Sequence, residues 1–351
     1  MKTSSLPSLY IRADASQNIG TGHVMRCIAL GQAWQEKRGR VVFISHCESK
    51  KLQERIIDEG FDFIYIENPH PHPADLDKTI ETLSTMHYPP STNDWLVVDG
   101  YRFDSMYQKK IKEAGYKLLW IDDYGHAEHY YADIVLNQNV SAEASFYAKR
   151  EPATRLLLGT RYVLLRREFR QWQGWQREIP ATANKILVTL GGGDPENVTL
   201  KVVRALKQVG SSGLEAKIVV GPTNPNLHTL QQEVDDNANM QIITNATNMP
   251  ELMAWADVAV SAGGSTCWEM ALLGLPNMII FFADNQRPIA EKLHADNMAL
   301  SVGWGSKLTI EDITQSLEKL ICTAPLRKIF SINSRNLVDG DGAQRVCQEA
   351  M

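Results

Sequence analysis

The chain has 351 residues, of which 44% are hydrophobic and 22% charged, and its formal net charge is −5. This length suits two domains of roughly 150 residues each, and the composition is typical of globular proteins. The acidic balance provides no basic footprint for nucleic acid or for an anionic membrane surface, so we expect neither as a partner.

Cysteine usage and the apolar runs restrict the class of protein further. The five cysteines form no CxxC pair, which argues against a disulfide framework and against a zinc ribbon. The first residues, MKTSSLPSLYIRAD, do not resemble a signal peptide, and no apolar stretch approaches the roughly 18 residues of a membrane span. We therefore expect a cytoplasmic protein that inserts into no membrane. We also expect a monomer, although none of these features bears on the oligomeric state.

The first half of the chain alternates short apolar runs with helical patterns. Predicted strands are Leu9–Ala13, Val41–Ser45, Phe61–Ile66, Trp95–Asp99 and Lys117–Ile121, followed by shorter ones at Ala132–Leu136, Leu156–Leu158 and Tyr162–Leu165. Helices are predicted at Val24–Lys37, Ser49–Glu59, Ala74–Met86 and Ser105–Ala114. Such alternation predicts βαβ units and a parallel sheet.

The second half repeats this architecture after a stretch without strand periodicity. Predicted strands are Lys185–Leu190, Ala216–Val220, Gln241–Thr244, Asp257–Ser261, Asn277–Phe282 and Leu300–Gly303, again separated by helices. The predicted division is an N-terminal Rossmann-like domain at 1–165, a linker at 166–183, a C-terminal Rossmann-like domain at 184–325 and a helical tail at 326–351. The fold class is thus α/β with two doubly wound domains, and we expect ligand in the cleft between them.

The first candidate site follows the first strand, where Asp14 precedes the loop and helix start Gly20-Thr21-Gly22-His23-Val24-Met25-Arg26. Glycines allow close approach of a ligand, and a helix N-terminus attracts phosphate. The helix dipole there disfavours a charged imidazole, so His23 is the candidate catalytic base. Asp14, Gly22 and Arg26 are candidate substrate-binding residues. A histidine that only caps the helix or packs under the loop is an equal alternative for this motif taken alone.

Three further glycine- or amide-bearing motifs follow strands of the second half. Gly192 and Gly193 lie in LGGGDP, Gly264, Ser265 and Glu269 lie in SAGGSTCWE, and Asn285 and Gln286 follow NMIIFF. Exposed amides and a capping hydroxyl suit a diphosphate, and the glutamate could accept hydrogen bonds from ribose hydroxyls. Each motif alone could also be an ordinary strand–helix turn or helix start.

Two weaker features end strands of the first half. Tyr101, in DGYR, could bind substrate or donate a proton. Asp122 and Asp123 could hold a metal, but no third ligand has convincing spacing, so hydrogen bonding within a loop is favoured. We expect no metal and no cofactor.

Together, these motifs resemble the UDP-2,4-diacetamido-2,4,6-trideoxy-beta-L-altropyranose hydrolases of pseudaminic acid biosynthesis, within the glycosyltransferase-B superfamily. The resemblance covers residues 8 to about 290, through IRADASQNIGTGHVMRCIALGQAW, VVDGYRFD, WIDDYGHAEHYYADIVLNQN, LLGTRYVLLRREF, LVTLGGGDPENVT and SAGGSTCWEMALLGLPNMIIFFADNQ. In LLRREF the chain departs from the family pattern at Arg167, where proline is usual.

The resemblance implies metal-independent hydrolysis of a UDP-linked sugar to UDP and free sugar, with inversion at the anomeric carbon. His23 then matches the catalytic base, Gly264, Ser265 and Glu269 match the nucleotide-binding segment, and Met249 falls in the uracil loop. The resemblance of the second half extends to glycosyltransferases such as the lipid II N-acetylglucosaminyltransferase. A glycosyltransferase with a UDP-sugar donor and a non-catalytic sugar-nucleotide-binding protein therefore remain as alternatives.

Overall fold

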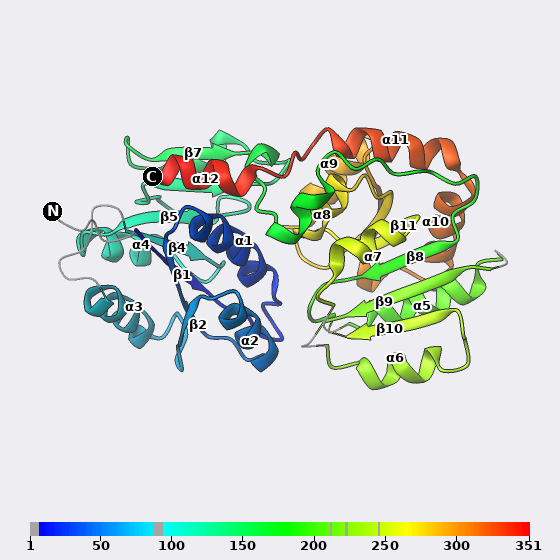
Figure 1. Cartoon of the computed structure of the whole chain (residues 1–351), viewed down its shortest axis with the longest axis horizontal. Coiled ribbons are helices and arrows are strands. Elements are labelled where there is room, and N and C mark those ends of the chain that lie inside the picture. Colours follow the sequence, from blue (N-terminus) through cyan, green and yellow to red (C-terminus); the bar gives the residue numbers. More distant parts are fainter. Residues whose placement is uncertain (1–6, 87–93, 195, 211–212, 222–223, 245) are drawn as a thin grey trace. The chain divides into compact units, whose positions relative to one another are not determined.

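The computed structural model describes residues 7–86, 94–194, 196–210, 213–221, 224–244 and 246–351. These residues form two compact units (Figure 1). The first unit comprises Met1–Arg167 and Asp341–Met351, and the second comprises Glu168–Gly340. Each unit is an α/β structure built on a parallel β-sheet, as the sequence predicts.

The first unit places strands in the order β3-β2-β1-β4-β5-β6-β7, with every neighbouring pair parallel. The strands are β1 (Ser8–Ala13), β2 (Arg40–Ser45), β3 (Asp62–Tyr65), β4 (Trp95–Asp99), β5 (Lys117–Ile121), β6 (Ile134–Asn137) and β7 (Arg155–Leu158). The helices are α1 (Gly22–Glu36), α2 (Lys50–Asp58), α3 (Pro73–Met86), α4 (Ser105–Glu113) and α12 (Gly342–Ala350), with short 3-10 turns η1 (Ala144–Tyr147) and η2 (Thr160–Tyr162).

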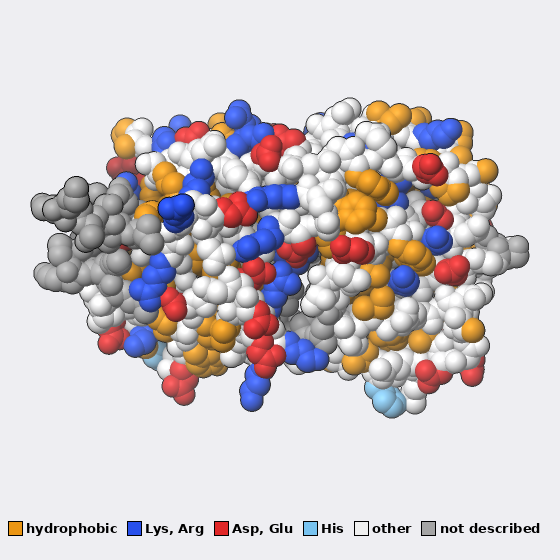
Figure 2. Space-filling model, viewed as in Figure 1, with side chains coloured by type: hydrophobic (Ala, Val, Ile, Leu, Met, Phe, Trp, Pro, Cys, Tyr) orange, Lys and Arg blue, Asp and Glu red, His pale blue; other side chains and the backbone are white. Residues whose placement is uncertain are grey.

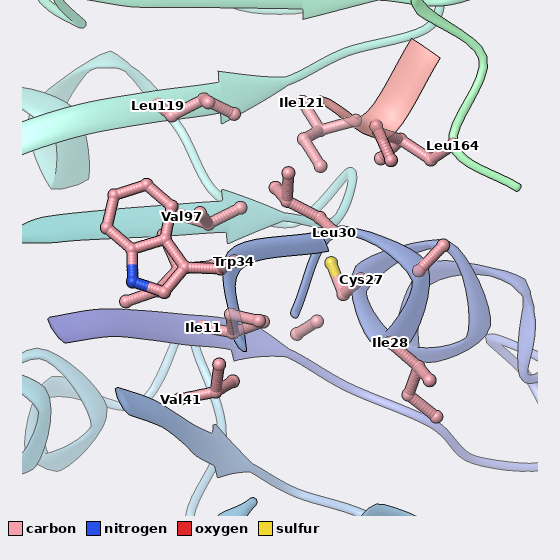
Figure 3. Packing of buried hydrophobic residues seen from close by; sticks show 14 of the residues in the cluster. Ile11, Cys27, Ile28, Leu30, Trp34, Val41, Val97, Leu119, Ile121 and Leu164 are labelled. Carbon is pink, nitrogen blue, oxygen red and sulfur yellow. The ribbon is translucent and has the colours of Figure 1, made fainter. Parts of the chain in front are cut away.

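Helices cover both faces of this sheet, so its strands are apolar on both sides. Trp34, Leu30 and Cys27 of α1 pack on one face, against side chains of β1, β4 and β5 (Figure 3). Residues of α2 and α12 join the same core, while α3 and α4 contribute to a separate core on the opposite face. Because successive residues of a strand point to opposite faces, Ile11 lies in the first core and Tyr10 in the second.

The second unit has the strand order β10-β9-β8-β11-β12-β13, again parallel throughout. Its strands are β8 (Lys185–Thr189), β9 (Glu215–Val220), β10 (Met240–Thr244), β11 (Val258–Ala262), β12 (Asn277–Phe281) and β13 (Leu300–Trp304). Its helices are α5 (Val198–Gln208), α6 (Leu227–Val234), α7 (Met249–Trp255), α8 (Thr266–Leu272), α9 (Arg287–Ala295), α10 (Ile310–Cys322) and α11 (Ala324–Arg335), and the 3-10 turns are η3 (Arg167–Trp172) and η4 (Gly305–Lys307). One core joins α5, α6, α10 and Phe330 of α11 to the sheet, and α7, α8 and α9 contact β8, β11 and β12.

One predicted strand is wrong: Tyr162–Leu165 does not pair with the sheet. Tyr162 ends η2, and residues 163–166 belong to no strand. The amide of Leu164 donates to Oε1 of Gln138 at 2.8 Å, in place of a strand partner. A Cβ at Gly342 would lie 2.2 Å from the carbonyl oxygen of Val163, so the start of α12 packs directly on this backbone. The apolar run is buried by a helix and not by a neighbouring strand.

The segments expected as linker and tail are parts of the two units. Residues 168–183 belong to the second unit, where the Arg177 guanidinium donates to the carbonyl oxygens of Met253, Ala256 and Leu273. The predicted tail at 326–351 contains most of α11, in the second unit, and α12, in the first. The last helix thus returns to pack against α1.

The surface carries charges of both signs. Figure 2 shows lysine and arginine side chains interspersed with aspartate and glutamate on the displayed face of each unit. Within the described ranges, the structure contains no helix with the length and apolar character needed to cross a bilayer.

Candidate active site

The sheet of the first unit has its topological switch point between β1 and β4. From β1 the chain continues to β2 on one side, whereas β4 pairs with the other side of β1. In such sheets, the carboxyl ends of the two central strands diverge into loops that leave room for a ligand. The loop after β1 leads into α1 at Gly22, and β4 ends at Asp99. The two segments that follow these strands therefore meet at one point.

His23 lies in the first turn of α1 and points to the end of β4. Its Nδ1 atom is 2.7 Å from Oδ1 of Asp99. Because an ionised carboxylate only accepts hydrogen bonds, Nδ1 carries the proton in this pair and Nε2 of the neutral ring is the acceptor. Within the described residues, Nε2 makes no hydrogen bond to another protein group. The ring is thus oriented by Asp99 with its basic nitrogen available.

Arg26, one turn further along α1, links two buried carboxylates. Its guanidinium donates to Asp99 through Nε and Nη2, both at 2.7 Å, and to Asp123 through Nη1 at 2.8 Å and Nη2 at 3.1 Å. Burial alone would raise the pKa of the Asp99 carboxyl, but the charges of Arg26 and His23 and their hydrogen bonds hold it well below its usual range. Asp99 is therefore ionised at neutral pH.

Tyr101 and Asn139 complete the surroundings of Asp123. The Tyr101 hydroxyl donates to Oδ2 of Asp123, and Nδ2 of Asn139 donates to Oδ1 at 2.7 Å. Burial and the nearby Asp123 carboxylate raise the pKa of Tyr101 far above its usual value, so it remains a phenol. The residue is 37% exposed, and its ring meets the His23 ring edge-on, with 4.8 Å between centroids. Tyr101 thus lies beside His23 with its hydroxyl directed at Asp123.

The first motif also contains the substrate-binding candidates Asp14 and Gly22. Asp14 is buried, and its carboxylate accepts from the Arg12 guanidinium and from the His46 amide at 2.7 Å. It belongs to a buried ion-pair group in which Arg12 also binds Asp75. Gly22 opens α1, and a Cβ there would meet no atom within 4 Å.

Three residues of this site were not singled out from the sequence for these roles: Asp99, Asp123 and Asn139. Each stands at or just after the carboxyl end of a buried strand, namely β4, β5 and β6. That position was the available signal, because the carboxyl ends of neighbouring parallel strands share one edge of the sheet. Asp122 does take the loop role expected of it, since it accepts from the amides of Tyr124 and Gly125 at 2.8 Å.

The second unit repeats the switch-point geometry, between β8 and β11. Gly192 and Gly193 follow β8, and Gly264 and Ser265 follow β11. Gly191 has a φ of +92°, a conformation that favours glycine, and Asp194 caps α5 by accepting from Val198 and Thr199 at 2.8 Å. The glycine loop is therefore fixed at both ends.

The loops after β11 and β12 are packed together. A Cβ at Gly263 would lie 2.9 Å from the Gln286 carbonyl oxygen and 3.0 Å from its Cβ, so only glycine fits without displacement. The Gln286 side chain accepts from the Phe282 amide at 3.0 Å, which closes the turn that contains Asn285. Half-buried Glu269 lies within α8, and the largely buried Met249 opens α7.

No group of three or more His, Cys, Asp or Glu side chains suited to a metal ion occurs among the residues that the structure describes. Asp122 and Asp123 point to different partners, as their separate hydrogen bonds require.

The chain is similar in sequence to one domain family and to several known proteins. Residues 186–328, within the second unit, match the glycosyltransferase family 28 C-terminal domain. An uncharacterized protein of Methanocaldococcus jannaschii is 26% identical over 87% of this chain, which spans 65% of that protein's length. A spore coat polysaccharide biosynthesis protein of Bacillus subtilis is 25% identical, and the match covers 96% of this chain and 95% of that protein. The UDP-2,4-diacetamido-2,4,6-trideoxy-beta-L-altropyranose hydrolase of Campylobacter jejuni is 26% identical, and the match covers 80% of this chain and 93% of that protein.

Solved structures show the same fold at low sequence identity. MurG of Acinetobacter baumannii aligns with a TM-score of 0.65 at 16% identity, over 98% of this chain and 99% of its own. The MnaA–UDP complex of S. aureus aligns with a TM-score of 0.68 at 12% identity, and the alignment covers 97% of this chain and 95% of the MnaA chain. The chain therefore has the fold of two Rossmann-like domains of the glycosyltransferase-B type, and its second unit carries the match to the glycosyltransferase family 28 C-terminal domain.

Proposed function

We propose that this protein hydrolyses a UDP-linked 2,4-diacetamido-2,4,6-trideoxy sugar to UDP and the free sugar, with inversion and without a metal ion, in pseudaminic acid biosynthesis. The observation that carries the proposal is the pair of His23 and Asp99, with 2.7 Å between Nδ1 and Oδ1 and with Nε2 free of protein hydrogen bonds among the described residues. The names of the Campylobacter jejuni and Helicobacter pylori relatives support the substrate class.

In the proposed reaction, His23 acts on water and the nucleotide leaves with its diphosphate. Nε2 takes a proton from water as the water oxygen bonds to the anomeric carbon. The bond from that carbon to the β-phosphate oxygen breaks, and its electron pair leaves with UDP. General-base catalysis of this kind contributes about 10²–10⁴-fold. A single displacement on the face opposite UDP inverts the anomeric carbon, as in inverting glycosidases.

Asp99 contributes by holding the ring and by stabilising the charge that forms on it. The carboxylate fixes the proton on Nδ1, so Nε2 keeps its lone pair for water. As the ring becomes an imidazolium ion, the adjacent anion favours that form. His23 then releases its proton to solvent, which restores the neutral base.

We assign nucleotide binding to the second unit. The candidate residues are Gly192, Gly193, Met249, Gly264, Ser265, Glu269, Asn285 and Gln286. Most of them follow strands β8, β11 and β12, at and beside the switch point, where doubly wound sheets bind nucleotides. The match of residues 186–328 to a glycosyltransferase family 28 domain supports this assignment. In the first unit, Tyr101 remains a candidate for sugar contact because the residue is partly exposed and its ring lies beside His23.

A glycosyltransferase with the same donor is the second candidate. The family 28 domain favours it, because that family is named for sugar transfer. The same base would then deprotonate an acceptor hydroxyl in place of water.

Incubation of the protein with the UDP-sugar in the absence of any acceptor separates the two functions. Hydrolysis predicts UDP and free sugar in equal amounts, with a rate that does not change on addition of EDTA. Release of UDP only when an acceptor is added would reject hydrolysis in favour of transfer. Binding without any turnover would favour a non-catalytic sugar-nucleotide-binding protein.

A further inference from the structure

Asp123 lies at the far side of the Arg26 guanidinium from Asp99. The residue follows β5, is 7% exposed, and receives two hydrogen bonds from Arg26 at 2.8 and 3.1 Å. We propose that Asp123 is a positioning residue for the reaction: its negative charge offsets Arg26, so that the Asp99 carboxylate can support protonation of His23. The inference rests on the proposed role of His23 as base.

The reason lies in the charges around the His23 ring. Arg26 binds both oxygens of Asp99 at 2.7 Å, and its Nη2 is only 3.3 Å from Nδ1 of His23. An opposite charge favours the charged form of a titratable group and a like charge disfavours it. Arg26 therefore cancels much of the effect of Asp99 on an imidazolium ion. With Arg26 bound to the Asp99 carboxylate and no second anion to offset its charge, the His23–Asp99 pair would be a weak base.

Asp123 restores the balance. Arg26, Asp99 and Asp123 together carry a net charge of −1, so protonation of His23 makes the cluster neutral and not positive. A buried cluster with a net charge is costly, because charges removed from water need partners. The second carboxylate thus makes proton uptake by His23 a step that neutralises the cluster.

Asp123 also fixes the direction of the guanidinium. Nη1 and Nη2 are held by Asp123, and Nε and Nη2 by Asp99, so the planar fork is bound along two edges. Nη2 of Arg26 already shares Oδ1 of Asp99 with Nδ1 of His23, and without Asp123 the guanidinium would lose the contacts that hold its other edge. The charge effect and the orientation effect act in the same direction.

Other groups near His23 and the two carboxylates are neutral donors. Tyr101 donates to Asp123 and meets the ring of His23 edge-on, Asn139 donates to Asp123, and Sγ of Cys27 lies 3.5 Å from Oδ2 of Asp99. Burial and Asp99 hold the pKa of Cys27 well above its usual value, so it contributes no charge. The charged groups bound within the described cluster are Arg26 and the two aspartates. His126, whose ring centroid lies 6.0 Å from that of Tyr101, pairs with Asp122 and also interacts electrostatically with Asp123.

The test is the pH profile of turnover for Asp123→Asn, which keeps the shape of the side chain and removes its charge. We expect kcat to fall about tenfold or more, and the acidic limb of the kcat profile to move about one unit to lower pH, because an imidazolium ion is less favoured. The KM for the UDP-sugar and the Kd for UDP should stay within about threefold of wild type.

Asp122→Asn is the matched control. Asp122 is the neighbouring buried carboxylate, but its partners are Tyr130, His126 and loop amides, with no bond to Arg26 or His23. We expect the acidic limb of the kcat profile of Asp122→Asn to coincide with that of wild type, even if the variant unfolds at a lower temperature. If Asp123→Asn lowers kcat with an unmoved acidic limb, Asp123 has only a structural role and the proposal is overturned.

A second variant keeps the test decisive if Asp123→Asn does not fold. Tyr101→Phe removes one donor from Asp123 and leaves more of its negative charge uncompensated. The acidic limb should then move to higher pH, opposite to the effect of Asp123→Asn, and an unmoved or lowered limb would contradict the proposal. Failure of the proposed function would look different, because His23→Ala would then retain turnover whatever the profile of Asp123→Asn.

Discussion

Nδ1 of His23 and Oδ1 of Asp99 are 2.7 Å apart, although 76 positions separate the two residues in the sequence. The parallel pairing of β1 with β4 brings them together, because α1 starts beyond the end of β1 and Asp99 ends β4. The contact orients the imidazole that the proposed reaction uses as its base.

Replacement of Asp99 tests that orientation. Asp99→Asn should lower kcat by roughly 10²-fold or more, since asparagine can donate to Nδ1 and so select the wrong tautomer, as is known for the Ser-His-Asp triad. The change also leaves Arg26 without one buried partner, which typically costs about 3–5 kcal/mol. Steady-state kinetics and thermal unfolding measure the two effects.

Asp62→Asn is the control for Asp99→Asn. Asp62 pairs with Arg40 at 2.7 Å, but both side chains are close to half exposed, and such pairs contribute about 0–1 kcal/mol. Its kcat should equal that of wild type. A wild-type kcat in Asp99→Asn would show that the carboxylate does not assist His23.

The paired glycines after β11 offer a test of nucleotide binding. A Cβ at Gly264 would meet no protein atom within 4 Å, whereas one at Gly263 would press on the Gln286 backbone. Gly264→Ala should therefore leave the unfolding temperature unchanged yet weaken UDP binding about tenfold or more, if UDP lies against this backbone. Gly263→Ala should lower both stability and affinity. Isothermal titration with UDP and thermal unfolding distinguish these outcomes, and full UDP affinity in Gly264→Ala would place the nucleotide elsewhere.

The pair of His126 and Asp122 predicts a pH-dependent contribution to stability. Burial alone would lower the pKa of His126, but Asp122, at 3.2 Å, and the Phe103 carbonyl raise it above its ordinary value near 6.5. A raised pKa means that the stabilisation is complete below the unfolded value and is lost as pH rises through the folded value.

His126→Gln should therefore destabilise the protein more at pH 5.5 than at pH 8.5. Urea unfolding of wild type and variant at the two pH values measures the difference. His294→Gln is a control, because the His294 ring accepts from the Ser301 amide at 3.4 Å and forms no ion pair among the described residues. A deficit of His126→Gln that is equal at both pH values would mean that the ring is not charged in the folded state.

The sequence predicts the sheets well because parallel strands are buried on both faces. Runs such as Leu96–Val98 in β4 are apolar without interruption, and each is followed by a helical pattern. The same signal fails at Tyr162–Leu165, where an equally apolar run is buried under α12. Hydrophobicity reports burial, and it does not reveal which element covers the run.

The candidate site is only partly predictable for a related reason. The glycine loop and His23 stand together in the sequence, so a local pattern identifies them. Asp99, Asp123 and Asn139 are brought to His23 and Arg26 by the order of strands in the sheet, which local periodicity does not specify. The guanidinium of Arg26 is bound by two aspartates within the protein, an arrangement that its place in the sequence does not reveal, and its predicted contact with substrate stays a prediction.

The most direct measurement follows the reaction by NMR as it proceeds, for wild type and His23→Ala, with the UDP-sugar as the only substrate. Wild type should form the sugar first as the anomer inverted relative to the donor, and His23→Ala should bind UDP normally but turn over at least about a hundredfold more slowly. First appearance of the retained anomer, or near-normal turnover in His23→Ala, would contradict water activation by this imidazole.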